Sequence, residues 1–210
     1  MDLADLAHCL PSGDQERVRT LVVQALGQGL EPLDVLNRGL IPGMDLVGRK
    51  FQAGEFYIPH LLLAARAMHA ALDVLRPVLA ETGARAAAAV VLGTVAGDLH
   101  DIGKNLVKIM LEGKGFEVRD IGIDAAPEKF VEAVDEEVKV VGLSALLSTT
   151  APRLGDTLEA LDKAGLLNRV KAMVGGGAVT QAYADKIGAD GYGPDAVTAA
   201  DLALKLAGLA

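Results

Sequence analysis

The sequence predicts two parts, an N-terminal all-α helical bundle and a C-terminal α/β unit with a doubly wound, five-stranded parallel sheet. Apolar residues recur at helical spacing up to about residue 79, and from residue 83 onward short apolar runs alternate with amphipathic stretches. The composition fits a large aliphatic interior, because 51% of the 210 residues are hydrophobic, only 3% are aromatic and 24 are glycines.

Residues 1–82 are predicted to form a bundle of about four helices. Apolar residues recur every three to four positions from Asp14 to about Leu79, and prolines and glycines divide this segment. Pro59 suits the first turn of a long helix that reaches about Leu79. The stretch 81–84, Glu-Thr-Gly-Ala, is the predicted linker to the second part.

Residues 83–210 are predicted to alternate strands with helices. The predicted strands are 87–92, 117–121, 138–143, 171–174 and 190–192. The predicted helices are 102–114, 127–136, 152–164, 180–187 and 195–206. Since the connections are helix-length, we expect parallel strands, right-handed crossovers and helices on both faces, in a Rossmann-like or flavodoxin-like arrangement. Ligands of such sheets bind beyond the carboxyl ends of the strands, which here lead into the loops 93–101, 144–150, 175–180 and 191–195.

The first of these loops carries Asp98 and, two residues later, His100. Asp98 or Asp101 could cap the following helix while His100 is merely exposed. Alternatively, His100 is a metal ligand whose Nδ1–H is held by Asp98, an arrangement that fixes the tautomer and raises the basicity of the ligand.

Three nucleotide- or phosphate-related motifs are excluded. Gly97 and Gly103 enclose five residues, whereas a phosphate-binding loop requires four, and Asn105 stands where its Ser or Thr belongs. The Gly-x-Gly-x-x-Ala run at 191–196 has no later βα unit to complete a dinucleotide-binding domain. A response regulator requires an aspartate after the third strand, where this chain has Ser144.

Two further loops have a composition typical of ligand contact. The segment 144–150 is rich in hydroxyls, which could also serve as helix caps ahead of Pro152. Three consecutive glycines, 175–177, indicate close backbone approach by a ligand, with a tight turn as the alternative.

Charge and cysteine content exclude several classes of protein. The net charge of −8 argues against nucleic-acid or anionic-membrane partners, and the single Cys9 excludes disulfide frameworks and multi-cysteine metal sites. No secretory leader is recognised at the N-terminus, and no uninterrupted apolar segment approaches membrane-spanning length. We therefore expect a soluble cytoplasmic protein.

Taken together, Asp98-x-His100-x-x-Gly103, Ser144-x-Leu146 and the glycine pair 175–176 resemble the cobalamin-binding fold. With the preceding bundle, nearly the whole chain is similar to the corrinoid carrier proteins of anaerobic methyltransferase systems. Cobalamin-dependent methionine synthase shares this two-domain layout.

The resemblance implies a corrinoid bound base-off, with His100 replacing dimethylbenzimidazole as the lower cobalt ligand. Asp98 and Thr150 would complete a His-Asp-hydroxyl relay, and these three residues are the expected catalytic set. Gly103, Gly175 and Gly176 would leave room for the nucleotide tail, to which Ser144 would donate. The full expected cofactor-binding set in this unit is Asp98, His100, Asp101, Ile102, Gly103, Ser144, Leu146, Ser148, Thr150, Gly175, Gly176 and Gly177.

The resemblance also implies that the bundle caps the upper face of the corrin. Phe51 and Ile58 would cover the methyl group, and Gly83 with its neighbours would be the hinge on which the cap moves aside. His60 stands where a Glu or Gln is expected.

The expected function is methyl transport on cobalt, with cycling between cobalt(I) and methyl-cobalt(III). One substrate-specific methyltransferase would load the corrinoid, a second would transfer the methyl group to tetrahydrofolate or coenzyme M, and a reductive activation protein would be a further partner. The sequence does not identify the methyl donor among methanol, methylamines, methyl sulfides, glycine betaine and methoxyarenes. A cobalamin-dependent sensor is the alternative function, and the small subunit of an adenosylcobalamin mutase is a third, against which residues 1–82 count.

Overall fold

The computed structural model describes residues 3–81 and 88–209, which form two compact units that meet in sequence at residues 86 and 87. Apart from the short segment 113–115, the helical unit comprises the residues before this point and the α/β unit those after it. Three residues of the predicted linker, 82–84, lie outside the described residues, as does the proposed hinge at Gly83.

The helical unit consists of the elements α1 (Leu3–Cys9), η1 (Leu10–Ser12), α2 (Gln15–Gly27), α3 (Pro32–Asp34), η2 (Val35–Leu40), α4 (Ile41–Gln52) and α5 (Ile58–Glu81). Because α3, the π-helical η2 and α4 follow one another without a break, residues 3–81 form about the four helical segments that the periodicity predicts. Helix α1 lies ahead of the predicted start at Asp14.

His60 closes the first turn of α5. Its Nδ1 accepts a hydrogen bond of 3.1 Å from the backbone N–H of Tyr57, and its ring stacks on Phe56 with 4.7 Å between the centroids. A Glu or Gln three residues into a helix makes the same backbone contact in a capping box. His60 therefore replaces the expected Glu or Gln as a helix-capping acceptor.

Helix α5 is the one described helix long and apolar enough to cross a membrane by length and composition, over Ile58–Leu79. The expectation concerned uninterrupted apolar segments, and charged residues interrupt this one. The stretch contains Arg66, Asp73 and Arg76, and 44% of its most apolar window is buried. Helix α5 packs on α2 and α4 within the unit, which is typical of a core helix.

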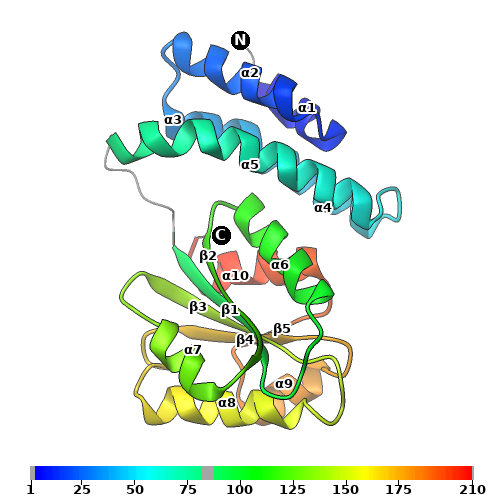
Figure 1. Cartoon of the computed structure of the whole chain (residues 1–210), viewed down its shortest axis with the longest axis vertical. Coiled ribbons are helices and arrows are strands. Elements are labelled where there is room, and N and C mark those ends of the chain that lie inside the picture. The colour runs from blue at the N-terminus through cyan, green and yellow to red at the C-terminus, as the bar shows by residue number, and fades with distance from the viewer. Residues whose placement is uncertain (1–2, 82–87, 210) are drawn as a thin grey trace. The chain divides into compact units, whose positions relative to one another are not determined.

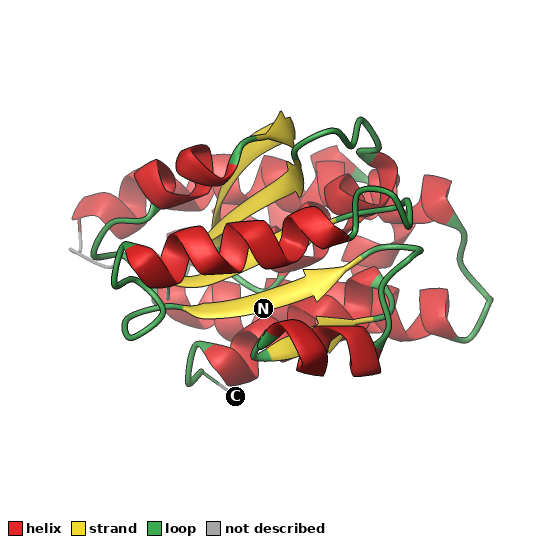
Figure 2. Cartoon of the chain, turned by 90° about the horizontal axis from the view of Figure 1, so that it is seen from below, coloured by secondary structure: helices red, strands yellow, loops and turns green. Residues whose placement is uncertain are grey.

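The α/β unit contains five parallel strands in the order β2-β1-β3-β4-β5. The strands are β1 (Ala89–Val95), β2 (Glu117–Ala125), β3 (Val138–Ser144), β4 (Lys171–Gly175) and β5 (Gly191–Gly193). The helices are α6 (Ile102–Gly113), α7 (Pro127–Ala133), α8 (Pro152–Lys163), α9 (Gln181–Ile187) and α10 (Ala196–Leu206). Figures 1 and 2 show strands between helices, with α6 and α10 on one face and α7, α8 and α9 on the other. The predicted doubly wound sheet is confirmed.

The interior of the sheet explains why these segments form strands. All seven residues of β1 are buried between β2 and β3, as its run of small and β-branched side chains requires. On the α7–α9 face, Phe130, Leu154 and Leu161 pack against the sheet in one apolar cluster.

Strand order places the candidate loops next to each other. After β1 the chain crosses to β2 on one side, and from β2 it returns to β3 on the other side of β1. The loops after β1 and β3 therefore meet at a switch point, where open α/β sheets bind ligands.

Candidate functional site

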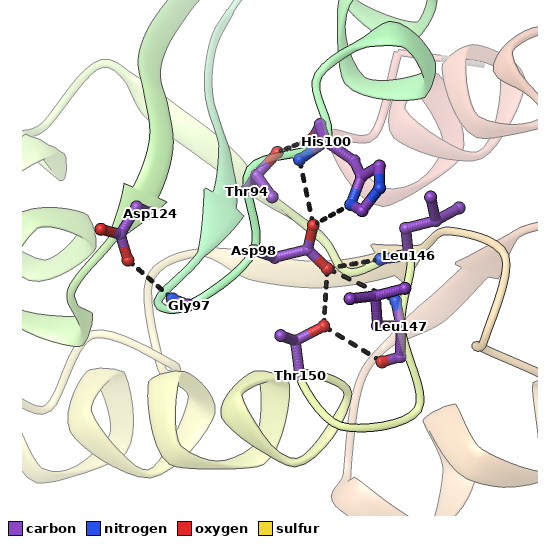
Figure 3. A network of polar contacts seen from close by, with 8 residues as sticks. All are labelled: Thr94, Gly97, Asp98, His100, Asp124, Leu146, Leu147 and Thr150. Carbon is purple, nitrogen blue, oxygen red and sulfur yellow. Dashed lines mark hydrogen bonds and ion pairs between the residues drawn. The ribbon is translucent and has the colours of Figure 1, made fainter.

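Asp98 joins the loop after β1 to the loop after β3 (Figure 3). Its Oδ1 lies 2.8 Å from His100 Nδ1 and accepts the His100 backbone N–H at 3.1 Å. Its Oδ2 accepts the N–H of Leu146 at 2.8 Å, that of Leu147 at 3.4 Å and the hydroxyl of Thr150 at 2.6 Å. The carboxylate therefore connects the two loops and does not serve mainly as a cap for α6.

The environment of Asp98 determines which nitrogen of His100 carries a proton. Burial alone would raise the pKa of Asp98, but hydrogen bonds from Thr150, His100 and Leu146 outweigh burial and hold that pKa well below its usual range. Because the ionised carboxylate only accepts, His100 Nδ1 must carry the proton. The lone pair is then on Nε2, which has no hydrogen-bond partner among the described residues, and the side chain is 51% exposed.

A second polar network, which the sequence did not reveal, holds the start of α6. Lys104 is 3% exposed, and its Nζ lies 2.7 Å from both carboxylate oxygens of Asp120 on β2 and 2.8 Å from Asn105 Oδ1. Asn105 Nδ2 donates in turn to Asp101, the residue after His100. Burial would raise the pKa of Asp120, but Lys104 and the backbone of Gly122 lower it below its usual value.

A cavity of about 660 Å³ lies beside His100, between the sheet and the helices α6 and α10. Predicted site residues along its wall are His100, Asp101, Ile102, Gly103, Ser144, Leu146, Gly175, Gly176 and Gly177. The remaining wall residues are Leu92, Leu99, Lys104, Val107, Gly142, Leu143, Met173, Val174, Tyr192, Gly193, Pro194, Asp195, Ala196 and Ala199.

The predicted glycines differ in what requires them. A Cβ at Gly103 would meet nothing within 4 Å, so the space beside this residue is open. At Gly176, φ is +118° and a Cβ would lie 2.0 Å from the carbonyl oxygen of Ala145. A Cβ at Gly175 would lie 2.9 Å from the oxygen of Gly193. The protein's own backbone therefore already requires glycine at 175 and 176, as the tight-turn alternative proposed.

Three predicted residues of the α/β unit do not line the cavity. Asp98 and Thr150 are buried behind His100, and Ser148 is exposed on the loop after β3. Phe51 and Ile58 belong to the helical unit, where Phe51 lies near the end of α4 and Ile58 is the exposed first residue of α5.

Four of the fourteen wall residues that the sequence missed, residues 192–195, belong to the loop predicted after the fifth strand. This loop, 191–195, was identified as a candidate, but no residue in it was assigned. Asp195 caps α10 by accepting the N–H groups of Val197 and Thr198, both at 2.9 Å. The sequence therefore indicated this loop only through its position after a predicted strand, and no motif within it marked a ligand-contacting residue.

These features define a class of protein. The cavity is large, opens beside one half-exposed imidazole, and is bordered at Gly103 by space that no protein atom fills. No group of three metal-binding side chains occurs among the described residues. The site fits a large organic ligand that lies beside a single half-exposed imidazole.

Comparison with known proteins gives the family. A family model described as a B12 binding domain matches residues 88–201, and a second B12 binding domain model matches residues 3–76. Dimethylamine corrinoid protein 1 of Methanosarcina acetivorans is 42% identical over 206 residues, covering 97% of this chain and 96% of that protein. Trimethylamine corrinoid protein 2 of the same organism is 42% identical over 189 residues, covering 89% and 87%.

Two solved structures resemble the whole chain. A cobalamin-binding protein from Desulfitobacterium hafniense DCB-2 has a TM-score of 0.82 and 32% identity, with 98% of each chain covered. A methanol:cobalamin methyltransferase complex from Methanosarcina barkeri has a TM-score of 0.85 and 27% identity, covering 98% of this chain and 79% of that chain. The protein belongs to the B12-binding corrinoid proteins, and the predicted resemblance is confirmed.

Proposed function

We propose that this protein carries a methyl group between two methyltransferases on a corrinoid bound base-off, with His100 as its lower axial ligand. The observation that carries the proposal is the outward Nε2 of His100 beside the cavity, together with the Nδ1 contact of 2.8 Å to Asp98. The family assignment and the names of the relatives support a corrinoid in this position.

Residues of the α/β unit would bind both the cobalt and the nucleotide tail of the cofactor. His100 would ligate cobalt, Ser144 would donate to the tail, and the open space at Gly103 would admit it. When bound, the corrinoid supplies a cobalt centre that accepts and releases a methyl group. Residues 1–82 are proposed as the cap, with Phe51 and Ile58 excluding water from the upper face.

His100 and Asp98 would balance charge as ligation changes. While His100 ligates, its Nε2 lone pair is used and its Nδ1–H is donated to Asp98. When the ring is not ligated, Nε2 can take up a proton, and the ionised Asp98 stabilises the resulting imidazolium. Asp98 itself stays ionised, because Thr150 and Leu146 hold its pKa low. The proton taken up when His100 is not ligated therefore stays on the imidazole and does not move to Asp98.

The relatives named for dimethylamine and trimethylamine, at 42% identity, favour a methylated amine as the methyl donor of the partner enzyme. A second methyltransferase would pass the methyl group to tetrahydrofolate or to a thiol such as coenzyme M. A reductive activation protein would reduce cobalt that has become oxidised. The packing of α5 on α2 and α4 supports a soluble protein, and we propose that it acts in the cytoplasm.

Reconstitution with cobalamin tests the proposal. The wild-type protein should give a base-off, histidine-ligated absorption spectrum, and His100→Ala should lose the histidine-ligated component. His60→Ala is the control, because His60 caps α5 and should leave the spectrum unchanged. A histidine-ligated spectrum that persists in His100→Ala would refute the assignment. Failure to exchange methyl groups with any methylamine methyltransferase would favour a sensor.

A further inference from the structure

Asp124, near the end of β2, has a left-handed backbone conformation. Its φ is +49°, and it is the one non-glycine residue with positive φ among residues 3–81 and 88–209. Aspartate tolerates this region better than most residues, but the conformation is still unfavourable relative to glycine. Such residues persist where the surrounding structure requires them, often next to functional sites.

Two hydrogen bonds connect Asp124 to the turn that carries Asp98, and Figure 3 shows the one from Gly97. The backbone N–H of Gly97 donates to Asp124 Oδ1 at 2.6 Å, and the backbone N–H of Asp124 donates to the carbonyl oxygen of Asp98 at 3.0 Å. Gly97 has a φ of +79°, so a left-handed residue in β2 is hydrogen-bonded to a left-handed residue in the loop after β1. Asp124 thus fixes the main chain on both sides of the Asp98 side chain.

The strand register shows how Asp124 reaches this position. Leu92 pairs with Asp120, but the next pair is Gly93 with Gly122, and Val95 pairs with Ala125. Strand β2 therefore contains extra residues relative to β1 at the end nearest the site. Bulges of this kind bend a strand and redirect side chains, frequently beside active sites.

We propose that Asp124 is a positioning residue for His100, acting through the backbone of Gly97 and Asp98. The proposal rests on the proposed role of His100 as cobalt ligand. Asp124 does not contact His100. It holds the main chain at the Gly97 N–H and at the Asp98 carbonyl, so that one carboxylate oxygen of Asp98 reaches His100 Nδ1 and the other reaches the loop after β3. A small displacement of this segment would weaken both contacts at once.

Three substitutions separate the side chain from the backbone conformation. Asp124→Asn keeps an acceptor and tolerates positive φ. Asp124→Gly keeps the backbone conformation but removes the acceptor, and Asp124→Ala removes the acceptor and disfavours the conformation. Asp190→Ala is the matched control, because the Asp190 carboxylate also accepts a backbone N–H, that of Ala172 at 2.8 Å, at the start of β4. Its loss should affect stability alone.

The first readout requires no cofactor. Ring ¹⁵N shifts of His100 at neutral pH should show the Nδ1–H form in the wild type, because Asp98 accepts from that nitrogen. Asp124→Gly and Asp124→Ala should lower the ratio of Nδ1–H to Nε2–H by about tenfold, the effect of losing about one charge-assisted hydrogen bond. Asp124→Asn and Asp190→Ala should keep the wild-type ratio. His60 is an internal reference with the opposite, Nε2–H tautomer, since its Nδ1 accepts from Tyr57.

The second readout is the histidine-ligated fraction after reconstitution with cobalamin, with thermal unfolding of the cofactor-free variants measured in parallel. The fraction should fall in Asp124→Gly and Asp124→Ala and stay unchanged in Asp124→Asn and Asp190→Ala. If the two acceptor-free variants lose only stability, as Asp190→Ala should, the proposal is wrong.

The two hypotheses fail in different ways. If His100→Ala keeps the histidine-ligated spectrum, the proposed function fails, while the tautomer ratio still tests Asp124 in the cofactor-free protein. If His100→Ala loses that spectrum but Asp124→Gly keeps both the spectrum and the tautomer, the positioning role alone fails. Should Asp124→Ala not fold, Asp124→Gly, which has no conformational strain, decides the outcome.

Discussion

Replacing Thr150 by Val removes one hydrogen bond to Asp98 with little change in shape. The Thr150 hydroxyl lies 2.6 Å from Asp98 Oδ2, the Thr150 residue is 7% exposed and Asp98 is fully buried. The same hydroxyl lies 3.0 Å from the carbonyl oxygen of Leu147, but its single proton is donated to the charged partner. Thr150→Val leaves Oδ2 with the backbone donors of Leu146 and Leu147 alone.

A buried hydrogen bond to a charged group contributes about 1.5–3 kcal/mol, so Thr150→Val should lower the free energy of unfolding by that amount at pH 7. The same loss corresponds to a rise of about one to two units in the pKa of Asp98. Thr150→Ser keeps the hydroxyl and should lose less than about 1 kcal/mol.

The pH dependence of this effect has a definite sign. Because the folded-state pKa of Asp98 is depressed, its contribution to stability is present above the ordinary aspartate pKa and is lost as pH falls through the folded-state value. Thr150→Val raises that folded-state pKa. Because the unfolded chain is common to both proteins, the difference in stability should be constant above the folded-state pKa of the variant. It should shrink only as pH falls from that value toward the lower folded-state pKa of the wild type.

Native-state hydrogen exchange at the β3 amides measures opening of the α/β unit directly, whatever the helical unit does. The Asp98 carboxyl ¹³C shift, followed through an acid titration, reports its pKa. An unchanged ¹³C titration in Thr150→Val, or a loss of stability equal in Thr150→Val and Thr150→Ser, would refute the role assigned to this hydroxyl.

Three further predictions follow from the geometry of the α/β unit. Lys104→Met leaves Asp120 without its closest cation and should lower the unfolding free energy, measured by hydrogen exchange, by about 3 kcal/mol. Adding Asp120→Asn to the same chain should restore part of this loss. A loss under about 1 kcal/mol in Lys104→Met would contradict the role of this ion pair. Gly176→Ala should lose at least about 3 kcal/mol, because of its φ and its contact with Ala145. Gly103→Ala should change stability by less than about 1 kcal/mol but weaken cobalamin binding about tenfold, because the added methyl group enters the open space proposed for the nucleotide tail. Equal cobalamin affinity in Gly103→Ala and wild type would show that the tail does not pass beside residue 103.

The strands and most helices could be predicted from the sequence because their apolar patterns match the sheet they form. The ends were less predictable. Strand β1 reaches Val95 and β2 reaches Ala125, each beyond its predicted end, since pairing in the sheet overrides the low strand propensity of Gly93 and Gly122. Helix α1 precedes Asp14, where the predicted helical periodicity begins.

Part of the site depends on contacts that no local pattern encodes. The motif with Asp98 and His100 was visible because its residues are two apart, and the loop after β3 was found from its place in the strand order. The pairs Lys104–Asp120 and Gly97–Asp124 are 16 and 27 residues apart, and Asp124 lies beyond the shift in register between β1 and β2. A hydrophobic pattern does not specify that shift.

The most direct test of the account is electron paramagnetic resonance of the protein reconstituted with cobalamin, in its paramagnetic cobalt(II) form, with ¹⁵N-labelled histidine. If His100 ligates cobalt through Nε2, the cobalt lines should be split by one ¹⁵N nucleus, and the splitting should disappear in His100→Ala but persist in His60→Ala. A ¹⁴N splitting from the cofactor's own base, or a ¹⁵N splitting that survives in His100→Ala, would contradict the account.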